Sequence, residues 1–393
     1  MESATVGIIA APNLPADVAE DLKNEVADQL ADYIDDKVDW KVESLVDPLI
    51  GVAENTNKIL DKVLNIKKNY NWNYAICLTD LPLYAGKHLA VADASIENSV
   101  ARISIPVFGF MPMRRRIKKA FIQMMGELYY RSSSKDEFTT EIAHRKPFLK
   151  KEKSHRLKKI RPPALSLIKR KDISEDDEQM DVRYIIRSRL IGRLRVLSGM
   201  TFANRPWSAL FSFNKLITLS FATGTYMAIF PTPWQLSIAY SIERSIAIMV
   251  LAILGTIIWV IFSHDLWEKP TKKGKKRWRD LYNWTTFMTL GVIIVSNYMI
   301  LFVIFLAAIA IFVPPSLFEA WTGLQDDPTP QYYFSLVWLI TSLGTLAGAI
   351  GTGIEEQEKI RDITYSYRQK QRYYEIEKEE EKEEKEGKEA GSS

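Results

Sequence analysis

The chain has 393 residues, of which 47% are hydrophobic and 25% charged, and its formal net charge is +4. The single cysteine, Cys77, excludes an internal disulfide and a zinc site built from several cysteines. The small net charge does not indicate a partner, but the charges are unevenly distributed, because most of them lie before Ser208 or after Gly353.

The N-terminal third alternates between helix and strand patterns. The start lacks a basic region followed by an apolar stretch of signal-peptide length, so we expect a non-secreted N-terminus. Apolar spacing predicts helices at 15–34, 48–67 and 113–130, and strands at 5–10, 38–43, 74–78, 89–94 and 100–105. This order predicts an α/β domain with one mixed sheet over residues 1–135, able to fold alone.

Three consecutive segments of this domain resemble a known family. NYAICLTDLPLY, HLAVADAS and VARISIPVF, followed by a helix, are similar to the core of the archaemetzincins, a family of zincin-like metallopeptidases. The resemblance covers roughly residues 1–131 and rests on the turn Leu78–Tyr84 and on the order of the elements. It implies a zincin-like fold.

The helix that would carry the metal in that family differs in its chemistry. The resemblance implies an HExxH-type motif, but the chain has Gln123-Met124-Met125-Gly126-Glu127. HExxH works because two histidines on one helix face hold zinc while the glutamate activates water. Both histidines and the base are replaced, so we expect no catalytic residue, no metal and no cofactor.

Three polar residues of the domain remain as candidates for a turn or an interaction. Thr79 and Asp80 follow a predicted strand, where Asp80 is expected to cap a turn rather than to catalyse, and Glu127 lies on the last helix. The sequence contains no P-loop, GxGxxG or GxSxG motif.

Residues 136–207 are expected to form a basic linker before the membrane. Between 142 and 171 the lysines and arginines are opposed by one acid, Glu152. Anionic lipid headgroups are the expected partner, and nucleic acid is the alternative that we do not expect. Residues 182–200 predict a basic segment rather than an amphipathic helix, because Arg193 falls on the apolar face. The residues expected to face lipid are Lys150, Lys151, Lys158, Lys159 and Arg161.

Four apolar segments predict an all-α membrane region at 208–354. A bilayer core needs roughly 20 helical residues, and the candidates are 209–230, 245–262, 284–313 and 333–353. The third is too long for one upright span and predicts a tilted or overhanging helix. Buried helices of a large soluble protein are the alternative, which the lengths and aromatic ends disfavour.

The charges of the connections predict the orientation. Lys269–Arg279 is rich in lysine and arginine, whereas the connection between the third and fourth spans carries Glu319, Asp326 and Asp327 without a basic residue. The positive-inside rule then predicts a multi-pass protein of the cell membrane with both termini in the cytoplasm.

Small residues recur on the fourth span, and a charged tail follows it. Gly344, Gly348 and Gly351 predict close helix packing, either within the chain or between copies as a homo-oligomer. The tail at 355–393 is predicted to be a solvated or coiled-coil helix, or partly disordered.

Three functional classes follow from these features. The first is a non-catalytic membrane protein whose cytoplasmic domain serves in interaction or scaffolding. The second is a membrane-anchored enzyme with a site of another kind in the α/β domain, which the altered helix disfavours. The third is an oligomeric channel or transporter, which the lack of ionisable residues within the spans disfavours.

Overall fold

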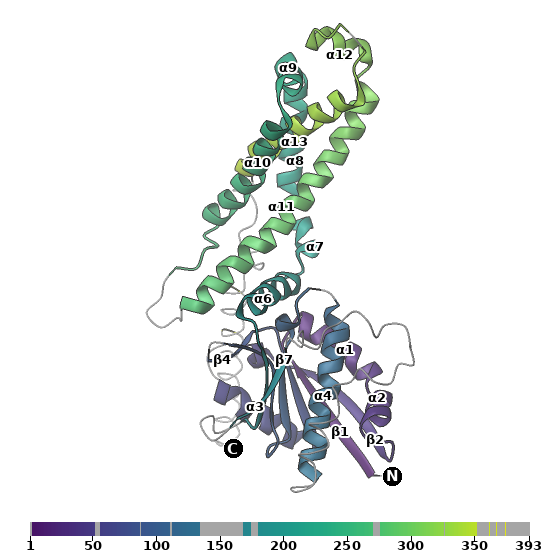
Figure 1. Cartoon of the computed structure of the whole chain (residues 1–393), viewed down its shortest axis with the longest axis vertical. Helices are drawn as coiled ribbons and strands as arrows, with labels where there is room; N and C mark the ends of the chain where they lie inside the picture. Colours follow the sequence, from purple (N-terminus) through teal and green to yellow (C-terminus); the bar gives the residue numbers. More distant parts are fainter. Residues whose placement is uncertain are drawn as a thin grey trace, which may run out of the picture. The chain divides into compact units, whose positions relative to one another are not determined.

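The computed structural model describes residues 2–51, 56–86, 88–110, 112–133, 168–173, 180–269, 276–325 and 327–351, together with residues 361, 367 and 374. It divides into two compact units, and the boundary between them lies between Ala203 and Asn204. The first is a mixed α/β sheet domain and the second is helical (Figure 1).

The first unit is built on an eight-stranded sheet in the order β2-β1-β3-β6-β5-β8-β7, with β4 paired to β5. The strands β1, β2, β3 and β6 run parallel, whereas β5 is antiparallel to both β6 and β8. The central strand β3 is almost wholly buried, while β2 at the edge alternates between buried and exposed positions. The strands are β1 (Glu2–Ala10), β2 (Val38–Val46), β3 (Tyr74–Thr79), β4 (Leu83–Ala85), β5 (His88–Ser95), β6 (Val100–Ser104), β7 (Ile168–Asp172) and β8 (Val182–Ile186).

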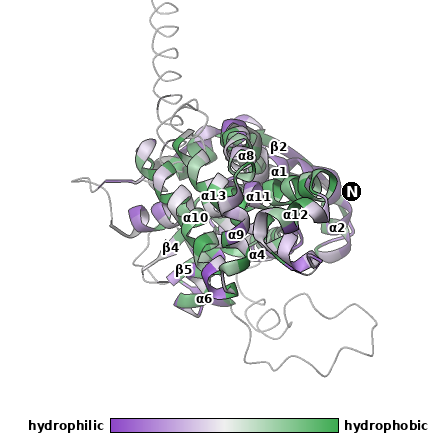
Figure 2. Ribbon diagram, turned by 90° about the horizontal axis from the view of Figure 1, so that it is seen from above, coloured by the Kyte–Doolittle hydropathy of each residue, from purple (hydrophilic) through white to green (hydrophobic). Residues whose placement is uncertain are grey.

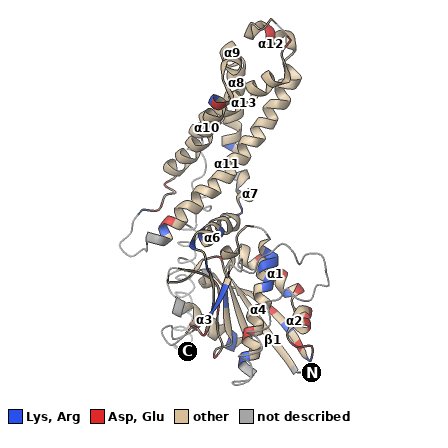
Figure 3. Cartoon of the chain, in the orientation of Figure 1, with Lys and Arg blue, Asp and Glu red and all other residues tan. Residues whose placement is uncertain are grey.

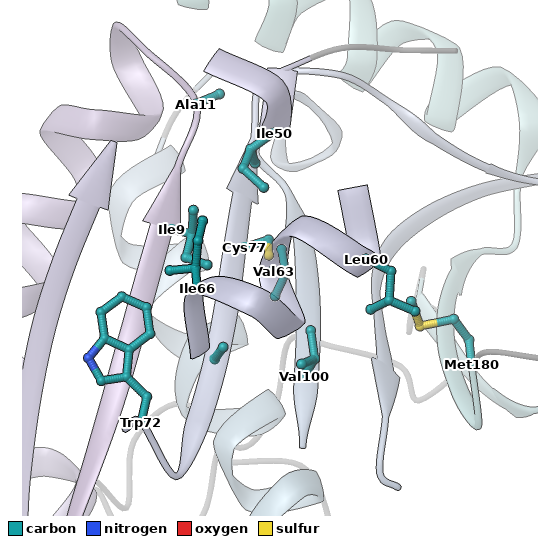
Figure 4. Packing of buried hydrophobic residues seen from close by; sticks show 11 residues of the cluster. Ile9, Ala11, Ile50, Leu60, Val63, Ile66, Trp72, Cys77, Val100 and Met180 are labelled. Carbon is teal, nitrogen blue, oxygen red and sulfur yellow. The ribbon is translucent and has the colours of Figure 1, made fainter. Parts of the chain in front are cut away.

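Helices cover both faces of this sheet. On one face lie α1 (Leu14–Glu25), α2 (Ala27–Tyr33) and α4 (Met113–Ser133), with ion pairs between α1 and α4. On the other face, α3 (Thr56–Asn69) buries Leu60, Val63 and Ile66 against Cys77 and Val100 (Figure 4). The short helices η1 (Pro48–Gly51) and η2 (Ile105–Phe108) follow β2 and β6.

Most predicted elements of residues 1–133 are present, with three differences. The segment predicted as one helix at 48–67 contains the 3-10 helix η1 at 48–51 and the α-helix α3 at 56–69, and residues 52–55 lie outside the described residues. The helix predicted at 15–34 is divided at Val26, although hydrogen bonds from Val26 to Leu22 and from Leu30 to Val26 continue through the bend. The strand β4 was not predicted, because its three residues are too few to show a period of two.

The predicted linker is wrong for residues 168–203. Here β7 and β8 extend the sheet, and α6 (Arg189–Ala203) packs on η2. The Cβ position of Gly199 would lie 2.1 Å from the carbonyl oxygen of Pro106, so this contact requires glycine. The α/β domain therefore continues beyond residue 135 as far as Ala203.

The second unit contains three helices long and apolar enough to cross a membrane, at Ile242–Ser263, Trp278–Phe312 and Pro330–Ile350, among the residues that the structure describes. Figure 2 colours the ribbon by the hydropathy of each residue. The charged residues of the long helices lie near the ends of these helices (Figure 3). The elements are α7 (Pro206–Ala209), η4 (Leu210–Phe213), α8 (Asn214–Ala228), α9 (Pro231–Ala239), α10 (Ile242–Ser263), α11 (Lys276–Phe312), α12 (Pro315–Thr322) and α13 (Pro330–Gly351).

The long third segment is one continuous helix. The 37 residues of α11 rise about 55 Å, more than a bilayer core requires. Its first turns contain Lys276, Arg277, Arg279 and Asp280, so the excess length extends the N-terminal end. An overhanging helix at this place is what the sequence predicts.

The short helices α9 and α12 pack on each other at one end of the bundle (Figure 1). Trp234 of α9 is buried, its ring lies 4.9 Å from that of Trp321, and its indole N–H donates to the carbonyl oxygen of Ala228 at 2.9 Å. The connections α8–α10 and α11–α13 therefore lie at the same end of the bundle.

Candidate functional site

The second histidine position of the resembled motif is occupied by a buried glutamate that accepts hydrogen bonds from other side chains. Glu127, on the face of α4 that meets the sheet, is 2% exposed. Arg170 of β7 donates from Nε to Oε1 at 2.9 Å and from one Nη to Oε2 at 3.3 Å. The hydroxyl of Tyr184 on β8 donates to Oε1 at 2.6 Å. Two strands and a helix thus meet at one carboxylate.

Further polar groups complete an arrangement that we call the α4 network, formed by Gln123, Glu127, Arg131, Arg170, Asp172 and Tyr184. The amide of Gln123 donates to the Tyr184 hydroxyl at 3.0 Å. The guanidinium of Arg131 lies 3.7 Å from Glu127, and Asp172 accepts hydrogen bonds from Arg170 at 2.7 Å and from Arg131 at 3.3 Å. Gln123 and Glu127, four residues apart, therefore both face the β7–β8 hairpin.

In the α4 network, Glu127 accepts hydrogen bonds from one neutral donor, Tyr184, and one cationic donor, Arg170. Burial and the negative charge of Glu127 raise the pKa of the Tyr184 phenol, so this hydroxyl stays protonated and donates at neutral pH. Burial alone lowers the pKa of Arg170, but its hydrogen bonds and the charges of Glu127 and Asp172 outweigh that effect and raise it. Neither group is prepared for proton transfer near pH 7.

Thr79 is the last residue of β3, and Asp80 follows it in a bend. Both are buried, and the hydroxyl of Thr79 accepts a hydrogen bond from the backbone N–H of Leu81 at 3.2 Å. The hydroxyl of Ser104, the last residue of β6, donates to the carbonyl oxygen of Leu81 at 2.7 Å. The strands β6 and β5 separate β3 from β8, a distance of about 14 Å at the usual strand spacing. Asp80 thus follows β3, whereas Glu127, on α4, receives its hydrogen bonds from β7 and β8 at the edge of the sheet.

A second buried charge cluster lies on the sheet face that α3 covers. Asp93 of β5 accepts two hydrogen bonds from Arg102 of β6, at 2.9 and 2.8 Å, and lies 3.5 Å from Arg183 of β8. The three residues are direct cross-strand neighbours in the sheet register. The cluster was not anticipated, because each residue stands alone within its own strand and only the strand pairing brings them together.

Cys77 is not a candidate nucleophile. It is buried beside Val63 and Ala75 in the core under α3 (Figure 4). Burial raises the pKa of its thiol to about 12, so the reactive thiolate is scarce at neutral pH.

The described residues include no group of three His, Cys, Asp or Glu side chains able to hold a metal ion. Glu127 could supply one carboxylate, but its oxygens already accept from Arg170 and Tyr184. What the α4 network can do is mechanical, since it fixes the last helix of the predicted domain to the hairpin that leads into α6.

In the helical unit, the small residues of α13 contact α8 of the same chain. A Cβ atom at Gly348 would lie 2.0 Å from Oγ of Ser220, and one at Gly344 would lie 2.7 Å from the Ser220 carbonyl oxygen. On α8, a Cβ atom at Gly224 would lie 2.4 Å from the Phe305 ring. The backbones of α8 and α13 therefore approach closely, as small residues in membrane helices allow. The surroundings of Gly351 are not among those described.

Several polar side chains of the bundle are buried inside it. Asn297 of α11 is 1% exposed, and neither atom of its amide has a hydrogen-bond partner among the described residues. Tyr298 and Ser342 share a hydrogen bond of 2.8 Å between α11 and α13. The predicted lipid-facing residues Lys150, Lys151, Lys158, Lys159 and Arg161 fall outside the described residues.

No protein-family model matches the chain, and the comparisons with curated proteins and with solved structures gave no match either.

Proposed function

We propose that the protein is a non-catalytic integral membrane protein that holds an α/β domain at the cytoplasmic face of the cell membrane for interaction or scaffolding. One observation carries the non-catalytic part of this proposal. The residue at the second histidine position of the resembled motif, Glu127, is saturated by donors from Arg170 and Tyr184.

A catalytic zinc needs three protein ligands and an open position for water. To bind a cation, Glu127 would have to give up hydrogen bonds that are charge-assisted and buried, which are among the strongest in proteins. The zincin-like ancestry is part of the proposal, and under it the metal-binding side of the helix has been converted into a helix–sheet contact.

The membrane part of the proposal adds a fourth span to the three long helices. The 15 residues of α8 and the 4 residues of η4 together rise about 30 Å, which is the thickness of a bilayer core. The close contact of Ser220 and Gly224 with α13 and α11 supports the inclusion of α8 in the membrane bundle.

Apolar residues exposed on α10 and α11 support lipid as the surroundings of this bundle, because a water-soluble protein rarely leaves so many on one surface. These include Leu251, Ile258, Phe262, Met299, Val303 and Ile311. The location of the α9 and α12 connections at one end, together with the basic residues of Lys269–Arg279 between α10 and the start of α11, supports an arrangement with both termini in the cytoplasm.

A zinc titration of the purified full-length chain tests the non-catalytic role. A ligand present at 100 times its Kd stabilises the folded state by about 2.7 kcal/mol. We expect that 100 µM zinc, an amount on the order of 100 times the Kd of a micromolar site, leaves the melting temperature of the wild type unchanged.

The matched control for this titration is Glu127→Gln, which has almost the same shape and lacks the charge. Wild type and variant should respond to zinc alike. If zinc raised the melting temperature of the wild type and the substitution abolished that rise, Glu127 would be a metal ligand and the proposal would be wrong.

A further inference from the structure

The helix α6 has two different faces. Its buried face, which includes Val196, Gly199 and Met200, packs on the sheet domain, where Gly199 touches the backbone of Pro106. On the other side Leu190 is 72% and Leu194 is 60% exposed. These leucines are four residues apart and therefore lie on one stripe of the helix.

Arginines accompany the exposed leucines. Arg187, Arg189 and Arg193 are all exposed, and Arg189 and Arg193, four residues apart, fall on one side of the helix next to the leucines. Residues 187–203 contain no aspartate or glutamate. A stripe of large apolar side chains next to arginines is the composition of helices that lie in the headgroup region of a membrane.

A second patch of apolar surface lies near the C-terminal end of α6. The ring of Phe110, which is 50% exposed, packs edge-on against Phe202 at 5.3 Å. The chain then reaches η4 at Leu210, seven residues after Ala203, which can span at most about 25 Å. In the chain, the proposed membrane region thus begins shortly after α6.

We propose that the exposed face of α6, formed by Leu190, Leu194, Arg189 and Arg193, together with Arg187 just before the helix, docks on the anionic headgroups of the bilayer in which the same chain is embedded. The inference rests on the proposed membrane insertion, but not on its orientation. Anionic lipid is the partner expected for the whole basic segment at 136–207, and the inference goes beyond that expectation because it assigns the contact to one folded helix with apolar as well as basic side chains.

An anionic bilayer suits this face better than a protein partner does. Lipid headgroups supply negative charge next to an apolar layer, which matches both kinds of side chain on α6. Three arginines near an anionic surface strengthen attachment on the order of 100-fold at low salt, and screening weakens that effect.

The test places a dye on the docking face of the full chain. Leu194→Cys is labelled with an environment-sensitive fluorophore, and Leu190 and the arginines are kept. Labelling is selective because Cys77 is buried and the pKa of its thiol is about 12. The protein is reconstituted into vesicles of phosphatidylcholine alone or with phosphatidylglycerol, each containing headgroup-depth nitroxide lipid.

We expect quenching at least about 3-fold stronger in the anionic vesicles, reduced by 0.5 M salt. The double variant Arg189→Glu and Arg193→Glu should abolish the difference in quenching between the two kinds of vesicle. Both substitutions place a glutamate near the N-terminal end of α6, where the helix dipole is compatible with negative charge. The control dye at Lys41→Cys, an exposed position of β2, should show weak quenching in both lipids.

Equal quenching in the two lipids, or equal quenching at residues 41 and 194, would overturn the docking proposal. Flotation of the labelled protein with the vesicles distinguishes a failure of the docking proposal from a failure of the proposed membrane insertion. Protein that floats without lipid-dependent quenching refutes the docking alone, and protein that fails to float refutes membrane insertion as well.

Discussion

A fragment of residues 1–203 is expected to unfold cooperatively, whereas a fragment of residues 1–135 is expected not to fold. The shorter fragment lacks β8, which pairs with β5 along Ala90–Ala94, and so exposes the edge of a central strand. It also leaves Glu127 buried without Arg170 and Tyr184. This revises the expectation that the first 135 residues suffice.

The expected effect is large because the missing segment contributes to the core. Burying one large apolar side chain is worth about 1.5–3 kcal/mol, so five amount to on the order of 10 kcal/mol. A typical domain has a net stability of only about 5–15 kcal/mol. The five side chains lost after residue 135 are Met180, Val182, Ile186, Val196 and Met200, all of them buried.

Urea unfolding followed by circular dichroism distinguishes the two fragments. The longer one should give a sigmoidal transition and the shorter one a gradual, non-cooperative change. Leu190→Ser in the longer fragment is the control, because this exposed position should leave the midpoint unchanged. Equal midpoints for the two fragments would show that β7, β8 and α6 do not belong to the domain.

Glu127→Ala is expected to destabilise the 1–203 fragment by about 2–4 kcal/mol, since removing one partner of a buried ion pair strands the other groups. The value is at the lower end of the range for buried pairs because Arg170 is 29% exposed and can recover some hydration. Glu127→Gln should cost less, because it keeps an acceptor for Tyr184.

Two further variants separate the network from a general effect of substitution. Asp172→Ala should change the stability by about 0.5 kcal/mol or less, because the Asp172 side chain is 63% exposed. In a double-mutant cycle, Glu127→Ala and Arg170→Ala should be coupled by about 1 kcal/mol or more. Additive effects of these two substitutions would contradict the assigned contact.

Most elements of residues 1–133 could be predicted because they have a local signal, whereas the short strand β4 has none. Val18, Leu22 and Leu30 repeat at helical spacing, and β3 is a short apolar run followed by a turn. The strand β7 has no such signal, since its sequence IKRKD has the charge pattern of a solvated linker. Its place at the edge of the sheet depends on pairing with β8, which sequence spacing does not show.

The polar sites depended on long-range contacts in the same way. Glu127 was identified from its place in a motif, but its partners Arg170 and Tyr184 lie 43 and 57 residues later in the chain. Residues 182–200 were not predicted to form an amphipathic helix, because Arg193 would interrupt a single apolar stripe. The helix α6 instead buries small and apolar residues on one face and exposes two leucines on the other.

The central claim, a membrane protein with its sheet domain in the cytoplasm, is tested most directly by cysteine labelling in intact cells. Gln325→Cys, exposed after α12, should react with a membrane-impermeant maleimide from outside. Lys269→Cys, exposed between α10 and α11, should react only after permeabilisation, and buried Cys77 contributes no background. Labelling of Lys269→Cys from outside, with Gln325→Cys protected, would contradict the account.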